Sequence, residues 1–172
     1  MSQLMLIVGA ITLLGILLIP AHKVSINRQQ VLISTEATNT ATAIGQEMVE
    51  EISVRHFDEN YCGRGDSANS ASLFSVTCGL ETSQGDTAGK LWTYDDLDDF
   101  NGYTSTFITP RIGNFTDSCK VYYVTEDQPD IKSGTQTFLK RIDVKIKNQY
   151  LLSKDSTVTV SKIISYRYKG GL

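Results

Sequence analysis

The stretch from Leu4 to Ile19 reads LMLIVGAITLLGILLI, and Pro20 follows it directly. No Asp, Glu, Lys or Arg precedes Lys23, so the first 22 residues carry no charged side chain. At ~1.5 Å per residue, an apolar helix of this length approaches the ~30 Å hydrocarbon thickness of a bilayer. We therefore expect residues 1–22 to form an apolar helix that either spans a membrane or packs in the core of a filament.

A cleaved signal peptide is the first alternative for this segment. Such peptides begin with basic residues and end at a cleavage site of small residues. No basic residue precedes Leu4, and the sequence after Ile19 is Pro-Ala-His-Lys-Val, which does not fit a cleavage site. The sequence therefore favours a retained helix, with its N-terminus inside the cell and the rest of the chain outside.

A second helical pattern begins beyond Pro20. Apolar residues recur at steps of three and four, which places them on one face of a helix. They are Ile33, Ala37, Ala41, Ile44, Met48 and Ile52. A helix can continue through a proline with a kink, so we expect residues 23–56 to extend the apolar helix as its amphipathic half. The small side chains at two of these positions favour close approach of a sheet.

The C-terminal third has the alternating pattern of antiparallel strands with one wet face. Lys120–Thr125 reads as one strand. Phe138–Lys147 reads as a second, in which apolar residues alternate with charged ones. A third begins at Thr157, after a link (residues 148–156) of hairpin length.

The region from Asp58 to Thr106 is rich in glycine and reads mainly as loops, with one short strand expected at Leu73–Cys78. Residues 57–172 should then form one antiparallel β-domain. The predicted fold is α+β, with a long helix, kinked near Pro20, packed on that sheet.

Composition and residue inventory narrow the function. The net charge is only −3 and basic residues do not cluster, which argues against a nucleic-acid-binding protein. His22 and His56 stand too far apart on one helix to share a metal ion. No set of Ser, His and Asp or of Cys and His suggests catalysis, so we expect a protein that is not an enzyme and holds no organic cofactor.

One acidic run is a candidate metal site. Its members are Asp95, Asp96, Asp98, Asp99 and Asn101. Oxygen ligands at such spacing suit Ca²⁺, although the order is not that of an EF-hand. The alternative is a solvated turn in which the Asp side chains cap backbone N–H groups.

The chain has three cysteines, Cys62, Cys78 and Cys119. The first two flank a loop rich in Gly, Ser and Asn, and a disulfide closing it would contribute ~3 kcal/mol in the chain-entropy model. We favour the pairing of Cys62 with Cys78. The third cysteine lies beside a strand and is an alternative partner for either.

The N-terminal pattern resembles that of type IV pilin-like proteins, the subunits of type IV pili and of type II secretion pseudopili. Gln3-Leu4-Met5-Leu6-Ile7-Val8 lies on the family's apolar pattern. Gln3 falls on the family's glutamate, and Pro20 falls on its kink proline without a gap. The nonapeptide Asp95–Tyr103 is similar to a motif of some minor pilins of mannose-sensitive haemagglutinin type.

The resemblance implies a structural subunit assembled through Gln3, Gly9, Gly15 and Pro20, with the glycines as small contact positions at helix–helix crossings. It implies copies of the same chain or related pilins as partners, together with an inner-membrane assembly platform and its ATPase. The expected location is the bacterial inner membrane before assembly, then an extracellular filament or a periplasmic pseudopilus.

Two departures from the family stand out. The family's basic leader ending in glycine does not precede Leu4 here, so we expect either that the sequence starts late or that it is an atypical, unprocessed member; in addition, the glutamate is Gln3. Glutamine keeps hydrogen bonds and avoids the cost of a charge in hydrocarbon, but it loses the ion pair that the family uses in assembly. The alternative function is a single-pass anchored domain that binds a partner or takes part in adhesion and does not polymerise.

Overall fold

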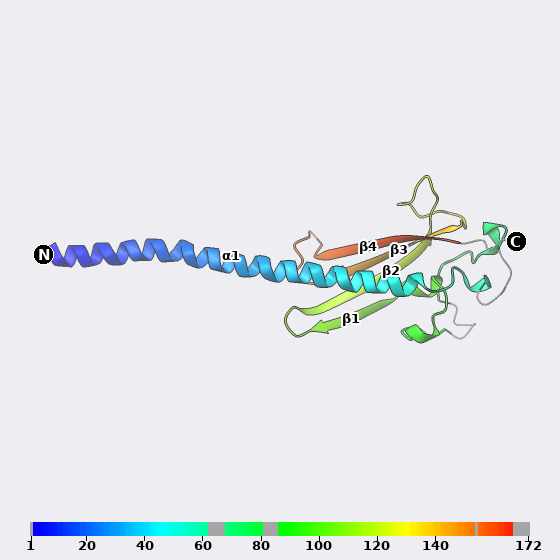
Figure 1. Ribbon diagram of the computed structural model, residues 1–172, viewed down its shortest axis with the longest axis horizontal. Helices are drawn as coiled ribbons and strands as arrows, with labels where there is room; N and C mark the ends of the chain where they lie inside the picture. Colours follow the sequence, from blue (N-terminus) through cyan, green and yellow to red (C-terminus); the bar gives the residue numbers. More distant parts are fainter. Residues whose placement is uncertain (1, 62–67, 81–85, 154, 167–172) are drawn as a thin grey trace.

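The computed structural model describes residues 2–61, 68–80, 86–153 and 155–166. One helix, α1 (Ser2–Ser53), runs nearly the whole length of the molecule. Its first half projects alone from a globular head, and its second half lies along the sheet of that head (Figure 1). The helix ends at Ser53, three residues before the end of the expected amphipathic half (residues 23–56).

The head is built on a four-stranded antiparallel sheet in the order β1-β2-β3-β4. Its strands are β1 (Thr104–Thr109), β2 (Gly113–Tyr123), β3 (Leu139–Lys147) and β4 (Thr157–Ser165). Each strand pairs with the next along the chain, with Cys119 opposite Val144 and Val144 opposite Val160. The α+β architecture and the three expected C-terminal strands are therefore confirmed.

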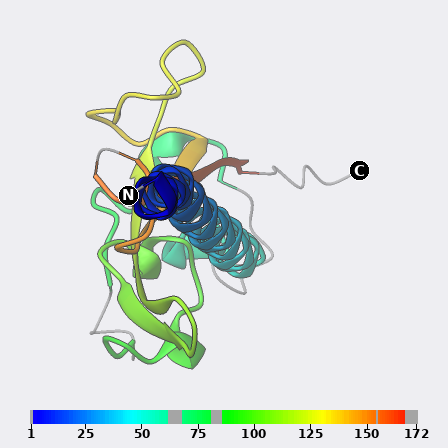
Figure 2. The ribbon, with the colours of Figure 1, turned by 90° about the vertical axis from the view of Figure 1, so that its left-hand side faces the viewer.

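Figure 2, viewed from the N-terminal end, shows α1 beside the sheet rather than within it. The helix packs mainly on β3 and β4. Buried side chains alternate along β3, where Ile142, Val144 and Ile146 have no exposed surface. This is the alternation expected of a strand with one face on the core.

The expected stripe on α1 faces the sheet. Ala37, Ala41, Met48 and Ile52 are buried, whereas Ile33 and Ile44 are half-buried. A side chain at Gly45 would meet Ile146 and Val160 at 2.7 Å each. Glycine at this position is therefore what allows the closest approach of helix to sheet, and the sequence pattern had not marked it.

Pro20 lies inside α1, and the helix runs through it without interruption. Figure 1 shows a gently curved helix over this stretch instead of a sharp break. Proline removes only one N–H from the hydrogen-bond ladder, so flanking turns can stay helical.

The strand expected at Leu73–Cys78 does not form. A short 3₁₀ helix, η2 (Ala71–Leu73), occupies its start. Phe74 inserts into an aromatic cluster, with ring centroids 5.0 Å from both Phe57 and Tyr166. The Ser75 N–H donates to a carboxylate oxygen of Asp58 at 2.9 Å. Side chains therefore satisfy this backbone, and no neighbouring strand is required.

Three further 3₁₀ helices lie in the same loop-rich region: η1 (Glu59–Tyr61), η3 (Leu91–Thr93) and η4 (Asp98–Phe100). The link after them leads into β1, which the sequence had not identified. Because β1 is an edge strand with most side chains exposed, its sequence shows no alternation of apolar and polar residues.

Candidate functional site

The projecting half of α1 presents a continuous apolar surface. Between Leu4 and Ile19 the large apolar side chains are 53% exposed at the least (Val8) and 80% at the most (Met5). Soluble proteins rarely leave such an area uncovered, and patches of this kind mark contacts with membranes or proteins. We take the exposed apolar surface of residues 4–32 as the candidate site and call it the stem.

The first part of the stem is suited to a bilayer. Its mean hydropathy reaches 2.6 over an 18-residue window, and none of that window is buried by the rest of the chain. By length and composition the helix is able to cross a membrane. The hydroxyl of Thr12 is already satisfied within the helix, because it donates to the Gly9 carbonyl at 2.9 Å.

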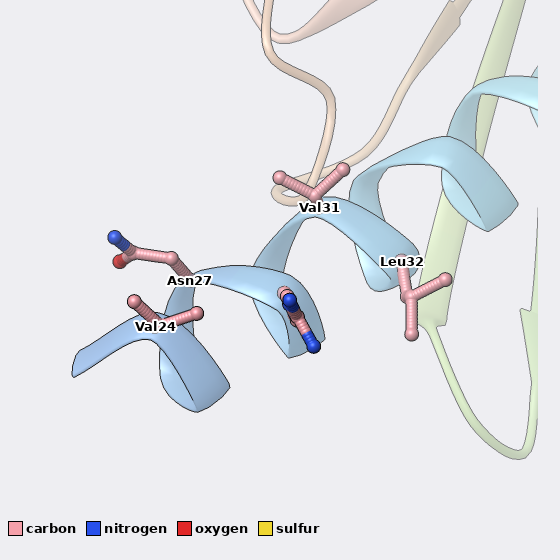
Figure 3. Close-up of a pocket in the computed structure, with 5 residues that line it drawn as sticks. Val24, Asn27, Val31 and Leu32 are labelled. Carbon is pink, nitrogen blue, oxygen red and sulfur yellow. The ribbon is translucent and has the colours of Figure 1, made fainter. Parts of the chain in front are cut away.

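The second part of the stem continues beyond the first charged residue. Val24, Val31 and Leu32 are 49%, 59% and 64% exposed. Together with Asn27 and Arg28 they line a shallow depression that α1 alone forms (Figure 3). The labelled apolar side chains in Figure 3 extend away from the helix, and the lining includes no residue of another element. This surface is apolar, yet the head does not cover it.

A groove joins the stem to the head. Ile26, Gln30 and Ile33 of α1 line it on one side, and Tyr150 and Leu152 of the β3–β4 link line it on the other. Leu152 is 75% exposed and Ile26 is 51% exposed. The apolar surface of the stem therefore reaches the edge of the globular head.

Of the four expected assembly residues, Gly9, Gly15 and Pro20 lie along the stem and Gln3 directly precedes it. Gly9 lies in a shallow apolar groove with Leu6 and Leu13, whereas Gly15 lies outside that groove. A side chain at either glycine would contact nothing within 4 Å. Both positions are thus open to a neighbouring helix in the free subunit, and Gln3 is exposed near the N-terminus.

The acidic run folds into a buried turn around η4. Asp96 Oδ1 accepts the N–H groups of Asp98 at 2.6 Å and Asp99 at 3.2 Å. Asp99 Oδ2 accepts the N–H groups of Asp95 at 3.0 Å and Asp96 at 3.3 Å. Burial raises the pKa of Asp96 and of Asp99 to about 6.

This geometry has the backbone capping of the alternative, but the turn is buried where that alternative expected a solvated one. Asn101 also serves the backbone: its amide donates to the Cys78 carbonyl at 2.8 Å, and its oxygen accepts the Val121 N–H at 3.2 Å. Within the described ranges, no group of three or more His, Cys, Asp or Glu side chains is placed to hold a metal ion. Calcium binding stays a prediction that this arrangement does not favour.

The disulfide prediction involves Cys62, which lies outside the described residues. Cys78 and Cys119 are free thiols in the structure. Burial raises the pKa of each thiol to about 12, so both are poor nucleophiles at neutral pH. His56 follows the helix and pairs through its backbone with Asp95 and Leu97, which makes it a structural residue.

The sequence reasoning missed Lys140, which is completely buried on β3. Its ammonium lies among Asp58, Asp98 and the Phe57 carbonyl. The sequence did contain an indication of this burial. Lys140 lies an even number of residues from Ile142 and Ile146 along the strand, so its side chain faces the core as theirs do. Only Asp98 of the acidic run reaches this cluster.

Comparison of the chain with models of known protein families, with curated proteins and with solved structures finds no match. The function must therefore be argued from the stem and the head themselves.

Proposed function

We propose that this protein is a pilin-like structural subunit that assembles into a filament through the stem of α1. The proposal is supported by the extent of the exposed apolar surface. Residues 4–32 span ~43 Å as a helix, whereas the hydrocarbon core of a bilayer is ~30 Å thick. A membrane anchor alone leaves part of this surface in water.

The observation that carries the proposal is the exposure of Val24, Val31 and Leu32 beyond Lys23. Lys23 and Arg28 mark where the helix leaves hydrocarbon, because charged side chains are costly inside it. Apolar side chains interleaved with these charges can be covered only by another protein surface. Neighbouring copies of the same helix supply such a surface along the whole stem.

In this account the subunit waits in a membrane with residues 1–22 in the bilayer and its head outside. Assembly moves the stem from lipid to a bundle of neighbouring stems. Helices in such a bundle approach most closely at small residues, a role that suits Gly9 and Gly15. Gln3 brings no charge into that bundle, so packing of apolar side chains has to supply most of the association energy.

The test compares the wild-type chain with Val31→Lys and Asn39→Lys. Both side chains are exposed on α1, so neither substitution disturbs the free subunit. The first places a charge on the stem, and the second places one on the outer face over the head. Shearing of cells that produce each chain separates surface filaments from the membrane fraction.

We expect wild type and Asn39→Lys in the sheared filament fraction and Val31→Lys only in the membrane fraction. Wild-type protein found only in membranes, or equal shearing of all three chains, would contradict the proposal. The first of these outcomes would favour the alternative, an anchored binding or adhesion domain that does not polymerise.

A further inference from the structure

A lysine and two aspartates form a fully buried cluster under the end of α1. Lys140 comes from β3, Asp98 from η4 and Asp58 from the segment after α1, and none of the three side chains is exposed. Lys140 Nζ contacts Asp98 Oδ1 and lies 3.2 Å from Asp58 Oδ2. The rings of Phe57 and Tyr123 lie 4.7 and 4.9 Å from the same nitrogen.

The charges of this cluster do not balance if every group is ionised. Two carboxylates and one ammonium leave a net charge of −1 among side chains with no exposed surface, and a buried unpaired charge is costly. Burial raises the pKa of Asp98 to about 8, so its neutral form is favoured at neutral pH. Lys140 and Asp58 then form a one-to-one ion pair, with Nζ and Oδ2 3.2 Å apart.

Hydrogen bonds hold the Asp58 carboxyl group in place beside Lys140. Its Oδ2 accepts the Ser75 N–H at 2.9 Å and the Tyr123 hydroxyl at 3.1 Å. Its Oδ1 accepts the Asn60 N–H at 3.2 Å. A fixed base, an amine and a neutral carboxyl therefore meet within one apolar shell, which is the arrangement that amide formation requires.

We propose that Lys140 and Asp98 become joined by an intramolecular amide bond between Nζ and Cγ, which the fold itself forms. Asp58 takes a proton from the Lys140 ammonium, and the free amine attacks the carboxyl carbon of Asp98. The C–O bond to the Asp98 hydroxyl then breaks, and that oxygen leaves as water after taking a proton from the attacking nitrogen. The products are the amide, one water molecule and protonated Asp58, so atoms and charges balance without any oxidant or further reactant.

Two physical effects favour the product. The amide and the protonated Asp58 replace a buried ammonium and a buried carboxylate by neutral groups, which removes the cost of keeping two charges in a closed site. The amide also leaves Asp98 with one side-chain oxygen instead of two, and Asp98 Oδ2 has no hydrogen-bond partner within the described residues. Water released from a closed apolar site does not readily return to hydrolyse the bond.

The ionisation of Lys140 sets the rate of the reaction rather than its outcome. Burial lowers the pKa of Lys140, but the negative charge of Asp98, in the fraction of chains in which it is ionised, and that of Asp58 outweigh this effect and raise it overall. The amine is therefore free only a small fraction of the time. A bond that forms once in the life of each chain needs no faster step.

The cross-link would tie the turn at η4 to β3, and with it the loop region that precedes β1. Unlike a disulfide, it would survive reducing agents. It does not depend on filament assembly, because every participating group belongs to one head.

The direct test is the intact mass of the full chain, purified in detergent, then reduced and denatured. We expect a mass lower than that of the sequence by one water molecule. Trypsin should fail to cleave after Lys140 and should release a branched peptide that joins Lys140 to the peptide containing Asp98. The full sequence mass, with normal cleavage after Lys140, would overturn the proposal.

Single-residue variants test the roles of Lys140 and Asp58 in forming the amide. Lys140→Met and Asp58→Asn should each retain the full mass, the first because it lacks the amine and the second because it lacks the base. Asp130→Asn, a change beside Arg141 on the exposed face, should lose one water as wild type does. A water deficit that persists in Asp58→Asn would overturn the role given to Asp58. The wild-type mass decides the bond itself, even if a variant fails to fold.

Discussion

The two halves of α1 belong to one continuous helix, yet they relate to their surroundings in opposite ways. On residues 33–53 the apolar side chains face the sheet, and Ala37, Ala41 and Ile52 have no exposed surface. On the stem, apolar side chains point outward all round the helix. The difference shows that the sheet covers the second half of α1, whereas the described residues of the head leave the stem exposed.

The sharpest test of this contrast truncates one large apolar side chain in each half. Ile52→Ala should lower the free energy of unfolding of the head by about 2–5 kcal/mol, because the removed methyl groups leave a cavity against the sheet. Leu32→Ala should change it by less than about 0.5 kcal/mol, because Leu32 is exposed. Denaturant unfolding in detergent, followed by circular dichroism, measures both. Equal losses in the two variants would remove the distinction between the halves.

Glycines offer a second matched pair. Gly45→Leu should destabilise the head by about 1–3 kcal/mol, because Ile146 and Val160 already lie 2.7 Å from the place of its Cβ. Gly15→Leu meets nothing within 4 Å and should leave unfolding unchanged. The same variant should reduce the yield of sheared filaments, because bulk at a small residue keeps helices apart. Normal filament yield from Gly15→Leu would show that this glycine is not a contact position.

The free energy of unfolding of the head should depend on pH. The first 22 residues of α1 should contribute nothing to this dependence, because they carry no charged side chain. Burial raises the pKa of Asp96 from 3.8 to about 6 in the folded head. The folded state therefore holds this proton more tightly than the unfolded state, and stability is lost as pH rises through that range. We expect the Asp96 contribution to fall by about 1–3 kcal/mol between pH 4 and pH 7.

Unfolding measured across this range should show a flatter pH profile for Asp96→Asn than for wild type. Asp127→Asn, on an exposed loop, serves as the control and should keep the wild-type profile. An Asp96→Asn profile identical to wild type would mean that other groups determine the pH response.

The smallest effect is expected where α1 meets the β1–β2 hairpin. Arg111 and Glu36 form an ion pair at 3.3 Å, with side chains 73% and 38% exposed. Exposed pairs contribute about 0–1 kcal/mol, so Arg111→Ala should lower the unfolding free energy by no more than that. The loss should shrink further in high salt. A loss comparable to that of Ile52→Ala would show that the hairpin is a main support of the helix.

Much of this architecture was predictable because it follows from periodicity. Steps of three and four marked the helix face around Ala37, and steps of two marked the buried face of β3. Features that depend on distant partners were not predictable. The segment after Leu73 looked like a strand until Phe57, Asp58 and Tyr123 were seen to supply its contacts.

The candidate sites also differ in how far the sequence predicts them, depending on whether composition or contacts between distant segments determine them. The first part of the stem was visible in the sequence because it depends on composition alone, whereas the exposure of Val24, Val31 and Leu32 beyond Lys23 was not predicted. The acidic run was visible too, but its use was not, since capping and metal binding require the same residues at similar spacing. The burial of Lys140 followed from its parity on β3, whereas the convergence of Asp58 and Asp98 on it depends on how three separate segments pack.

The central claim is that other copies of the chain cover the stem beyond the membrane, and thiol labelling of Val31→Cys tests it most directly. With Cys62 replaced by serine, the variant should resist a membrane-impermeant maleimide on intact filaments and react once detergent separates the subunits. Asp127→Cys, on an exposed loop of the head, should react under both conditions. Equal labelling of Val31→Cys before and after detergent treatment would contradict the account, because it would show a stem that stands in water without partners.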